Sequence, residues 1–252
     1  MLAFVRQVAP ALARCELSFM PRVAIDVARA QRQHAQYVAE LTALGCRIEW
    51  LPPLPAHPDG VFVEDTAVIV PELAVITRPG IASRRGEVTS VARALAGHLG
   101  VRELSGPACL EGGDVLRIGS VLHVGISGRS NAAGIAQLGE ILAPFGYTVR
   151  GVAMRDCLHL KSACTFIPPD TLLANPGWVD PAALGAARVI AVHPQEAFAA
   201  NTLTVGDRTL VSAAYPRTEE RLAAAGIRTQ ALEVSELHKA EAALTCLSLL
   251  LG

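Results

Sequence analysis

The sequence has few aromatic residues, no long hydrophobic run and almost no net charge. Aromatic residues make up 4% of its 252 residues, and 22 Lys and Arg nearly balance 23 Asp and Glu, which leaves a net charge of −1. Such a balance provides no long-range attraction to a phosphate backbone or an anionic lipid surface. Since no apolar run approaches the roughly 18 residues that cross a bilayer, we expect neither nucleic acid nor a membrane as a partner.

A secretion signal and paired cysteine motifs are also missing. The opening stretch is moderately apolar, but Arg6 and Arg14 interrupt it and no basic segment comes before it. The six cysteines include no CxxC pair and no zinc-knuckle spacing. We therefore expect reduced thiols, no metal site and a cytoplasmic location.

The chain does contain paired apolar runs. With 51% apolar and 18% charged residues, it predicts a globular protein with a sizeable core. Four stretches each hold two short apolar runs separated by turn residues, which is the pattern of a β-hairpin. These stretches are VFVEDTAVIVPELAVITRPG (61–80), LEGGDVLRIGSVLHVGISG (110–128), LHLKSACTFIPPDTLLANPG (158–177) and AANTLTVGDRTLVSAAYP (199–216).

Each predicted hairpin is followed by a stretch of helical periodicity and then by one more strand. In the stretch 84–100, Val88, Val91 and Leu95 fall on one helical face, and Gly100 ends the pattern. The other stretches with this organisation are 31–53, 131–146, 180–194 and 218–234.

A polar cluster opens each hairpin, and these clusters recur at a nearly constant interval. Their central residues, separated by 47, 48, 42 and 45 residues, are Glu64, Glu111, His159, Asn201 and Cys246. A hairpin, a helix and a strand need about that length, so the chain predicts an α/β propeller of five ββαβ repeats around a central channel. The last repeat lacks a second strand, which the N-terminal LAFVRQ supplies if the two ends of the chain pair and close the ring.

Equivalent positions on five blades bring their side chains to one centre. Taken alone, Cys246 in ALTCLSLLLG would more often be a buried apolar residue than a nucleophile. The repeat instead predicts that it shares the channel with carboxylates and an imidazole. The residues expected there are Glu64, Asp65, Glu111, Asp114, His159, Asn201 and Cys246.

Several of these segments resemble a known family. The segments are PDGVFVEDTAVI (58–69), ITRPGIASRRGE (76–87), LEGGDVL (110–116), SGRSNAAG (127–134), LHLKSACT (158–165), AAN (199–201), YPRT (215–218) and LTCLS (244–248). In this order they resemble the dimethylarginine dimethylaminohydrolases of the pentein superfamily of guanidine-modifying enzymes. The resemblance implies a five-bladed α/β propeller that forms a single catalytic domain over residues 1–252.

The resemblance also implies an activity and the residues that carry it. The family hydrolyses Nω-methylated arginines, both dimethylated and monomethylated, to citrulline and methylamines through a covalent cysteine thiouronium intermediate, without a cofactor. Its nucleophile falls on Cys246, its acid/base histidine on His159 and the carboxylate that orients this histidine on Glu111. The implied substrate contacts are Asp59, Asp65 and Glu64 for the guanidinium, Arg84 and Arg129 for the carboxylate, Phe62 for the apolar stem and Leu12 for a lid loop.

Elementary chemistry makes these residue types suitable. Carboxylates form bidentate, charge-assisted hydrogen bonds to a planar guanidinium cation. A thiolate is a strong nucleophile for its carbon, and one histidine can protonate the departing amine and then deprotonate water. Arginine binds a substrate carboxylate through two donors at once. The expected partner is therefore a small guanidine amino acid, and a homodimer remains open.

Alternatives remain open at this stage. The same Cys and His mechanism serves an arginine deiminase or another guanidine hydrolase. A propeller without activity could bind a cationic ligand through its acidic cluster, although binding alone needs neither Cys246 nor His159. A thiol hydrolase for neutral amides would have no use for several buried anions. Before its nucleophile the family has an Asp-Gly pair, where this chain reads Glu241-Ala242-Ala243.

Overall fold

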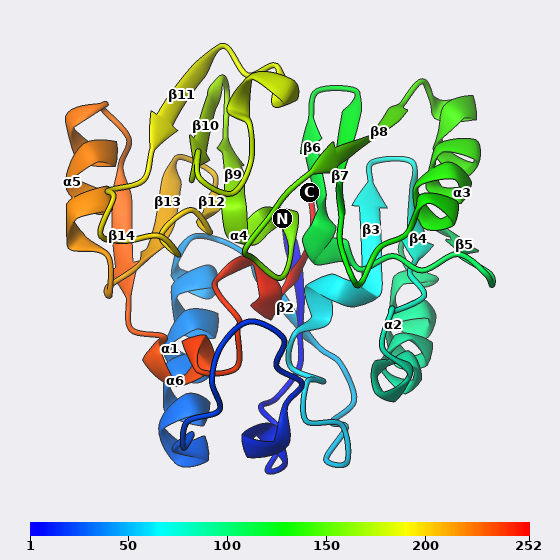
Figure 1. Ribbon diagram of the computed structural model, residues 1–252. Helices are drawn as coiled ribbons and strands as arrows, with labels where there is room; N and C mark the ends of the chain where they lie inside the picture. The colour runs from blue at the N-terminus through cyan, green and yellow to red at the C-terminus, as the bar shows by residue number, and fades with distance from the viewer.

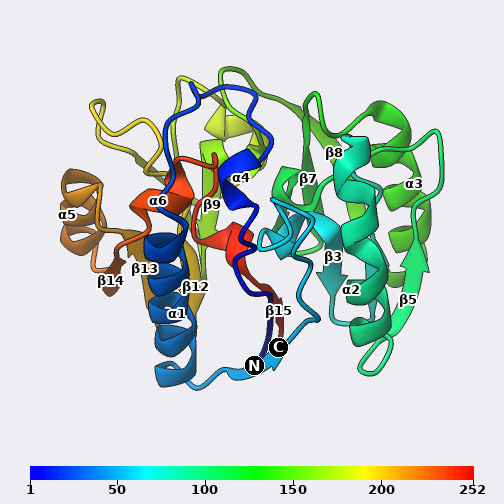
Figure 2. The same cartoon turned by 90° about the horizontal axis from the view of Figure 1, so that it is seen from below.

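Five three-stranded sheets surround a common centre in the computed structural model, which describes residues 1–252 (Figures 1 and 2). Each sheet has the same order: its first strand pairs antiparallel with the second, and the third runs parallel to the second. The sheets are β15-β1-β2 (Leu249–Leu251, Leu2–Val5, Arg47–Trp50), β3-β4-β5 (Ala67–Val70, Leu73–Ile76, Gly100–Glu103), β6-β7-β8 (Val115–Ile118, Val121–Ile126, Thr148–Ala153), β9-β10-β11 (Cys164–Ile167, Thr171–Ala174, Arg188–Ala191) and β12-β13-β14 (Leu203–Val205, Arg208–Ser212, Thr229–Leu232). The predicted five-bladed α/β propeller is confirmed.

In four of the five sheets an α-helix connects the second and third strands and lies at the rim of the ring (Figure 1). These helices are α1 (Val27–Ala43), α2 (Val88–Leu95), α3 (Ala132–Leu142) and α5 (Pro216–Ala224), while the short helices α4 (Leu160–Ala163) and α6 (Ser235–His238) lie elsewhere in the chain. The fourth sheet has only the 3-10 turn η6 (Pro181–Leu184) at this place. Gly185 adopts a φ of 66° directly after it, a left-handed conformation that ends the turn.

Local sequence signals account for these boundaries. The Asp26 side chain accepts a hydrogen bond from the Arg29 amide at the start of α1, and the Asn131 side chain accepts one from the Gly134 amide at the start of α3. In the hairpin turn between β6 and β7, Gly119 adopts a φ of 60° that other residues rarely adopt. The hairpins and helices are therefore encoded locally, and the repeat spacing arranges them.

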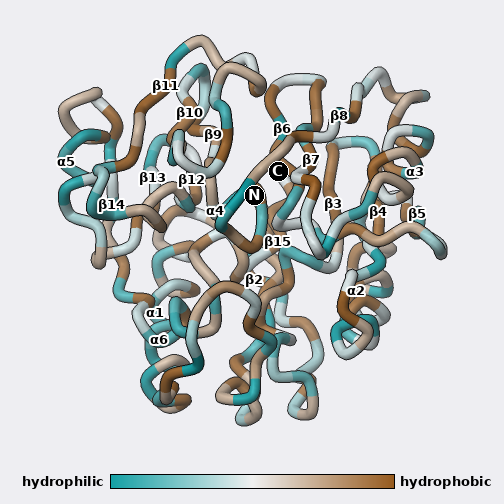
Figure 3. Tube along the Cα trace, viewed as in Figure 1, coloured by the Kyte–Doolittle hydropathy of each residue, from teal (hydrophilic) through white to brown (hydrophobic).

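The two ends of the chain close the ring. β1 pairs with β15 in the register Leu2 to Leu251 and Phe4 to Leu249, and the termini lie side by side in both views (Figures 1 and 2). First strands of neighbouring sheets contact one another, as β15 contacts β3 and β9 contacts β6 and β12. The strands near the centre are largely hydrophobic, whereas α5 at the rim is largely hydrophilic (Figure 3). In each sheet the third strand faces outward and the first strand lines the centre of the ring.

No helix combines the length and the apolarity that crossing a membrane would require.

Closing the ring depends on side chains of the two terminal strands. Phe4 is fully buried in a cluster with Leu249 and Val91. We expect Phe4→Ala to lower the free energy of unfolding by about 3 to 5 kcal/mol, because it leaves a cavity where the ends of the chain meet. The matched control is Phe145→Ala, whose side chain is 46% exposed and whose effect should stay within about 0.5 kcal/mol. Urea unfolding measures both, and equal effects would contradict this role of the strand pairing.

Candidate active site

Short turns in front of the first strands carry the predicted site residues. Glu64 and Asp65 lie in the 3-10 turn η2 (Val63–Thr66) before β3, and Glu111 directly precedes η4 (Gly112–Asp114) before β6. His159 directly precedes α4, and Cys246 lies in η7 (Thr245–Leu247) before β15. Because the first strands line the centre, residues from distant parts of the chain meet there.

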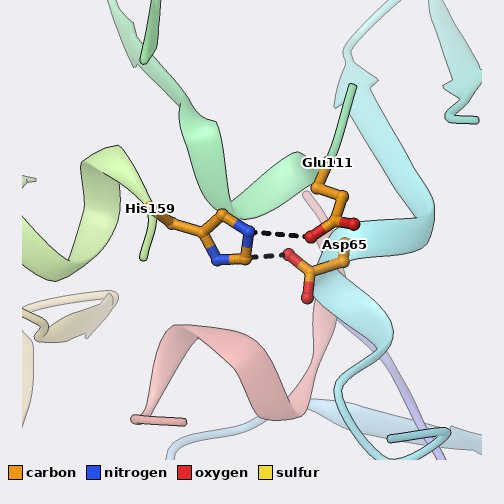
Figure 4. A group of neighbouring side chains, drawn as sticks. All are labelled: Asp65, Glu111 and His159. Atoms are coloured by element: carbon orange, nitrogen blue, oxygen red, sulfur yellow. Dashed lines mark hydrogen bonds and ion pairs between the residues drawn. The ribbon is translucent and has the colours of Figure 1, made fainter. Parts of the chain in front are cut away.

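His159 lies between two buried carboxylates (Figure 4). Its Nε2 is 2.8 Å from Glu111 Oε2, and its Nδ1 is 3.8 Å from Asp65 Oδ1. A Cβ atom at Gly113 would lie 2.6 Å from His159 Nδ1 and 2.8 Å from Asp65 Oδ1. Only glycine therefore fits against this cluster.

The carboxylates keep the imidazole of His159 protonated. Burial alone would lower the pKa of His159, but the charges of Asp65, Asp114 and Glu111 outweigh burial and raise this pKa to about 9. Burial likewise opposes ionisation of Asp65, yet the charges of His159 and Arg84 lower its pKa to about 2. The cluster therefore holds an imidazolium between carboxylates at neutral pH.

Two arginines balance the remaining negative charge. Arg84 Nη1 is 2.5 Å from Asp65 Oδ2, and Arg84 Nη2 is 2.8 Å from Glu87 Oε2. Arg129 Nη1 is 3.2 Å from Glu111 Oε2. The ligand atoms of Asp65, Glu111 and His159 lie within 4.8 Å of one another, close enough to chelate a metal ion. Since both carboxylates already pair with arginine, the cluster is better suited to proton transfer.

Cys246 lies beside this cluster with a protonated thiol. Burial raises the pKa of Cys246 well above its ordinary value, and the carboxylates of Glu64 and Asp65 raise it further. The Ala243 amide donates a hydrogen bond to its Sγ at 3.4 Å. The sulfur reaches the same cavity as the imidazole, so the thiol is placed for reaction but is not ionised at rest.

A cavity of about 20 Å³ joins most of the predicted residues. Those that line it are Asp59, Phe62, Asp65, Arg84, Arg129, His159 and Cys246. Glu111 lies behind His159 and is fully buried. Asp59 accepts hydrogen bonds from the Glu16 amide at 3.2 and 3.3 Å, and burial raises the pKa of this carboxyl to about 6.

Glu64 does not line this cavity. Its carboxylate accepts hydrogen bonds from Lys161 Nζ and Thr245 Oγ1, both at 2.6 Å. It lines a separate cavity of about 400 Å³ together with these two residues. In this structure Glu64 supports the turn that carries Cys246, because Thr245 is the residue directly before the cysteine.

Leu12, which the family resemblance assigned to a lid loop, does not lie at the site. It is fully buried in the core with Val8, Cys15 and Tyr37, and it does not reach the cavity. The segment 16–20, which follows a few residues later, contacts the site instead. The apolar character of Leu12 reflects core packing beneath that segment.

Lys161 and Thr245 were not predicted from the sequence, although both are near neighbours of predicted residues. Asn201, expected among the residues at the centre, ties backbone segments together: its Oδ1 accepts from the Thr245 amide, and its Nδ2 donates to the Lys161 carbonyl. Asp114 is directed away from the cavity, since its oxygens accept hydrogen bonds from Ser127, Ser130 and the Leu160 amide. These contacts hold the turns that present His159 and Cys246.

The raised pKa of His159 predicts how stability depends on pH. Its folded pKa, about 9, exceeds the unfolded value of about 6.5. Its stabilising contribution is therefore complete below pH about 6.5 and is lost as pH rises through about 9. We expect the free energy of unfolding to fall by about 3 kcal/mol over this range, and we expect no such fall in His159→Gln. Urea titrations at a series of pH values measure this, and an equal fall in both proteins would contradict it.

Comparisons with known proteins agree with this arrangement. No family model matches the chain. The dimethylarginine dimethylaminohydrolase of Streptomyces coelicolor is 39% identical over 248 residues, which cover 98% of this chain and 95% of the relative. The enzyme of the same name from Pseudomonas aeruginosa is 35% identical over 228 residues, 89% of each chain.

Solved structures show the same architecture. A cysteine-to-serine mutant of the Pseudomonas aeruginosa protein complexed with citrulline has a TM-score of 0.92 at 31% identity and covers 98% of both chains. The N-terminal domain of a cyanobacterial arginine dihydrolase has a TM-score of 0.89 at 21% identity, covering 98% of this chain and 96% of its own, and shows the fold alone. Identity over nearly the full length of the curated relatives establishes that this chain belongs to the dimethylarginine dimethylaminohydrolase family.

Proposed function

We propose that this protein hydrolyses Nω-methylated arginines to citrulline and methylamines through a covalent bond between Cys246 Sγ and the guanidinium carbon. The observation that carries the proposal is that the thiol of Cys246 and the imidazolium of His159 open into one cavity with buried carboxylates. The relatives named as dimethylarginine dimethylaminohydrolases and the citrulline-bound neighbour support the same reaction.

Binding of the guanidinium is assigned to Asp59 and Asp65. Asp65 is ionised, while burial holds the pKa of Asp59 near 6. A cation that enters the cavity compensates for this burial and favours the ionised form of both carboxylates. Phe62 lines the same cavity and offers an apolar surface to the methylene stem. The fixed carboxylates then hold the guanidinium carbon for attack.

Attack requires that Cys246 lose its proton. His159 is already protonated at neutral pH and cannot accept it. The positive charge of the bound substrate stabilises the thiolate, so the thiol proton leaves to solvent as the substrate binds. The thiolate adds to the guanidinium carbon and forms a tetrahedral adduct. A neutral thiol at rest thereby becomes a nucleophile only in the complex.

His159 serves both halves of the reaction. Its imidazolium donates a proton to the methylated nitrogen, and the carbon–nitrogen bond breaks to release the amine. The neutral imidazole then takes a proton from water, which attacks the thiouronium carbon. The second adduct expels the Cys246 thiolate, the hydroxyl proton passes to this thiolate to restore the resting thiol, and citrulline is left. Glu111, at 2.8 Å, orients the ring and stabilises its cationic form in each cycle.

The amino-acid end of the substrate is assigned to Arg84 and Arg129, which line the cavity. In this structure Arg84 is directed at Asp65 and Glu87, while Arg129 Nη2 contacts the Ser18 hydroxyl at 3.2 Å. When the substrate enters, Arg129 Nη2 exchanges the neutral Ser18 hydroxyl for the substrate carboxylate. A hydrogen bond to a charged acceptor is stronger than one to a neutral acceptor.

A second, largely apolar cavity that Cys246 also lines favours a methylated substrate over arginine. It has a volume of about 70 Å³, and its lining includes Leu158, Phe198 and Tyr215. Methyl groups on the reacting nitrogen gain from contact with this surface, whereas the unsubstituted nitrogen of arginine does not. The cytoplasmic location and the homodimer stay predictions.

The first prediction concerns the nucleophile. We expect Cys246→Ser to lower kcat by at least about 1000-fold, because a serine hydroxyl is a far weaker nucleophile without a base. Cys109→Ser, which changes another partly buried cysteine, should keep the activity of the unmodified protein. Citrulline release measures turnover, and mass spectrometry of the intact protein mixed with substrate should detect an adduct on Cys246. Turnover by Cys246→Ser at the normal rate would exclude the covalent mechanism.

The second prediction concerns substrate choice. Because two methyl groups contact the apolar cavity, kcat/KM for Nω,Nω-dimethylarginine should exceed that for arginine by at least about tenfold. Parallel assays of citrulline release at equal enzyme concentration measure the ratio. If arginine is the better substrate, the protein is an arginine deiminase with this site, and the methylarginine proposal is wrong.

A further inference from the structure

The carboxylate of Glu241 binds a segment of the chain more than 220 residues away. It accepts hydrogen bonds from three consecutive backbone amides, those of Ser18, Phe19 and Met20, at distances between 2.5 and 3.1 Å. Glu241 itself has a φ of 58°, a left-handed conformation that a residue with a side chain rarely adopts. The backbone strain and the three amide contacts coincide at one residue.

Hydrogen bonds are the most numerous contacts that hold the segment 16–20 in place. Phe19 is 53% exposed, and the half-buried Leu17 packs against the core. Two further contacts are polar: Asp59 accepts from the Glu16 amide, and Arg129 donates to the Ser18 hydroxyl. Among these contacts, Glu241 supplies the largest number of charge-assisted hydrogen bonds.

This segment covers the candidate active site. Glu16 and Glu241 line the cavity of about 20 Å³ that also contains His159 and Cys246. A volume of this size has room for about one water molecule. An amino acid with a guanidine group is many times larger, so the segment must move away before a substrate can enter.

We propose that Glu241 is the catch of this segment: its carboxylate holds residues 16–20 closed over Cys246, and release of the three amides opens the site. Glu241 acts through the backbone of the segment and is a positioning residue. The inference rests on the proposed function only for the identity of the entering substrate. Access to the cysteine and protection of the amides are measured without turnover.

Two substitutions separate the effect of the Glu241 carboxylate from the effect of its strained backbone. A carboxylate has two charged acceptor oxygens, whereas the side-chain amide in Glu241→Gln keeps one uncharged acceptor and turns its NH2 group toward the Ser18 amide, which is itself a donor. Glu241→Gly removes the carboxylate and adopts the left-handed conformation without strain. If the strained backbone alone closed the segment, the two variants would behave differently. The proposal expects both to open it.

Amide hydrogen exchange followed by NMR tests the catch directly. Exchange at Ser18, Phe19 and Met20 should accelerate at least about tenfold in Glu241→Gln and Glu241→Gly, which corresponds to about 1.4 kcal/mol of local opening. Exchange at Leu122 in the buried strand β7 should stay unchanged. Glu241→Asp, which keeps the carboxylate, should show exchange rates between those of the unmodified protein and Glu241→Gln.

Alkylation of Cys246 by iodoacetamide, quantified by peptide mass spectrometry at one fixed pH, tests access to the site. Its rate should rise at least about tenfold in both variants, because only the open form admits the reagent. Glu220→Gln, an exposed glutamate on α5, is the matched control and should leave the rate unchanged. Alkylation and exchange rates within twofold of the unmodified protein would overturn the proposal, whether or not the protein hydrolyses methylarginine. A folded variant is recognised by an unchanged thermal midpoint.

Discussion

The antiparallel pairing of β15 with β1 is the constraint on which the rest of the structure depends. β15 is the only strand of the first sheet that comes from the C-terminal end, and η7, which carries Cys246, directly precedes it. The pairing of Phe4 with Leu249 anchors the strand that follows the last turn, and Glu64 and Asn201 hold Thr245 within that turn. The N-terminal strand therefore helps to fix where the nucleophile lies, although it contributes no chemistry of its own.

Charge balance is the second constraint on the centre. Burying carboxylates is unfavourable unless each is paired or hydrogen-bonded. Here Asp65 pairs with Arg84, Glu111 pairs with Arg129, and His159 lies between the two carboxylates. The same contacts that offset the burial also raise the pKa of the imidazole. The contacts of Asp65 and Glu111 therefore do two things: they offset the burial of charge, and they keep His159 protonated for the reaction.

Much of this arrangement could be predicted from the sequence, because spacing and turn chemistry are local properties. The near-constant interval between Glu64, Glu111, His159, Asn201 and Cys246 was sufficient to predict the five blades. It could not distinguish which way each side chain points from its turn. The repeat placed Glu64 at the centre and the family resemblance assigned it to the substrate, but in this structure its carboxylate faces Lys161.

The segment 16–20, which covers the site, could not be predicted from the sequence for a different reason. Leu12 and the segment 16–20 are only a few residues apart, and no periodicity separates a core residue from a neighbouring loop. The contact that places this segment, between Glu241 and the amides of Ser18, Phe19 and Met20, joins distant parts of the chain. Pairings of this kind depend on the tertiary fold and leave no pattern in the sequence.

The protonated state of Cys246 has a consequence for the survival of the enzyme under oxidative stress. Peroxides oxidise thiolates to sulfenic acid, and they react slowly with neutral thiols. Because burial and neighbouring carboxylates hold the pKa of Cys246 high, the resting protein presents peroxide with an unreactive sulfur. At rest it is therefore less easily oxidised than an enzyme that keeps its catalytic cysteine as a thiolate.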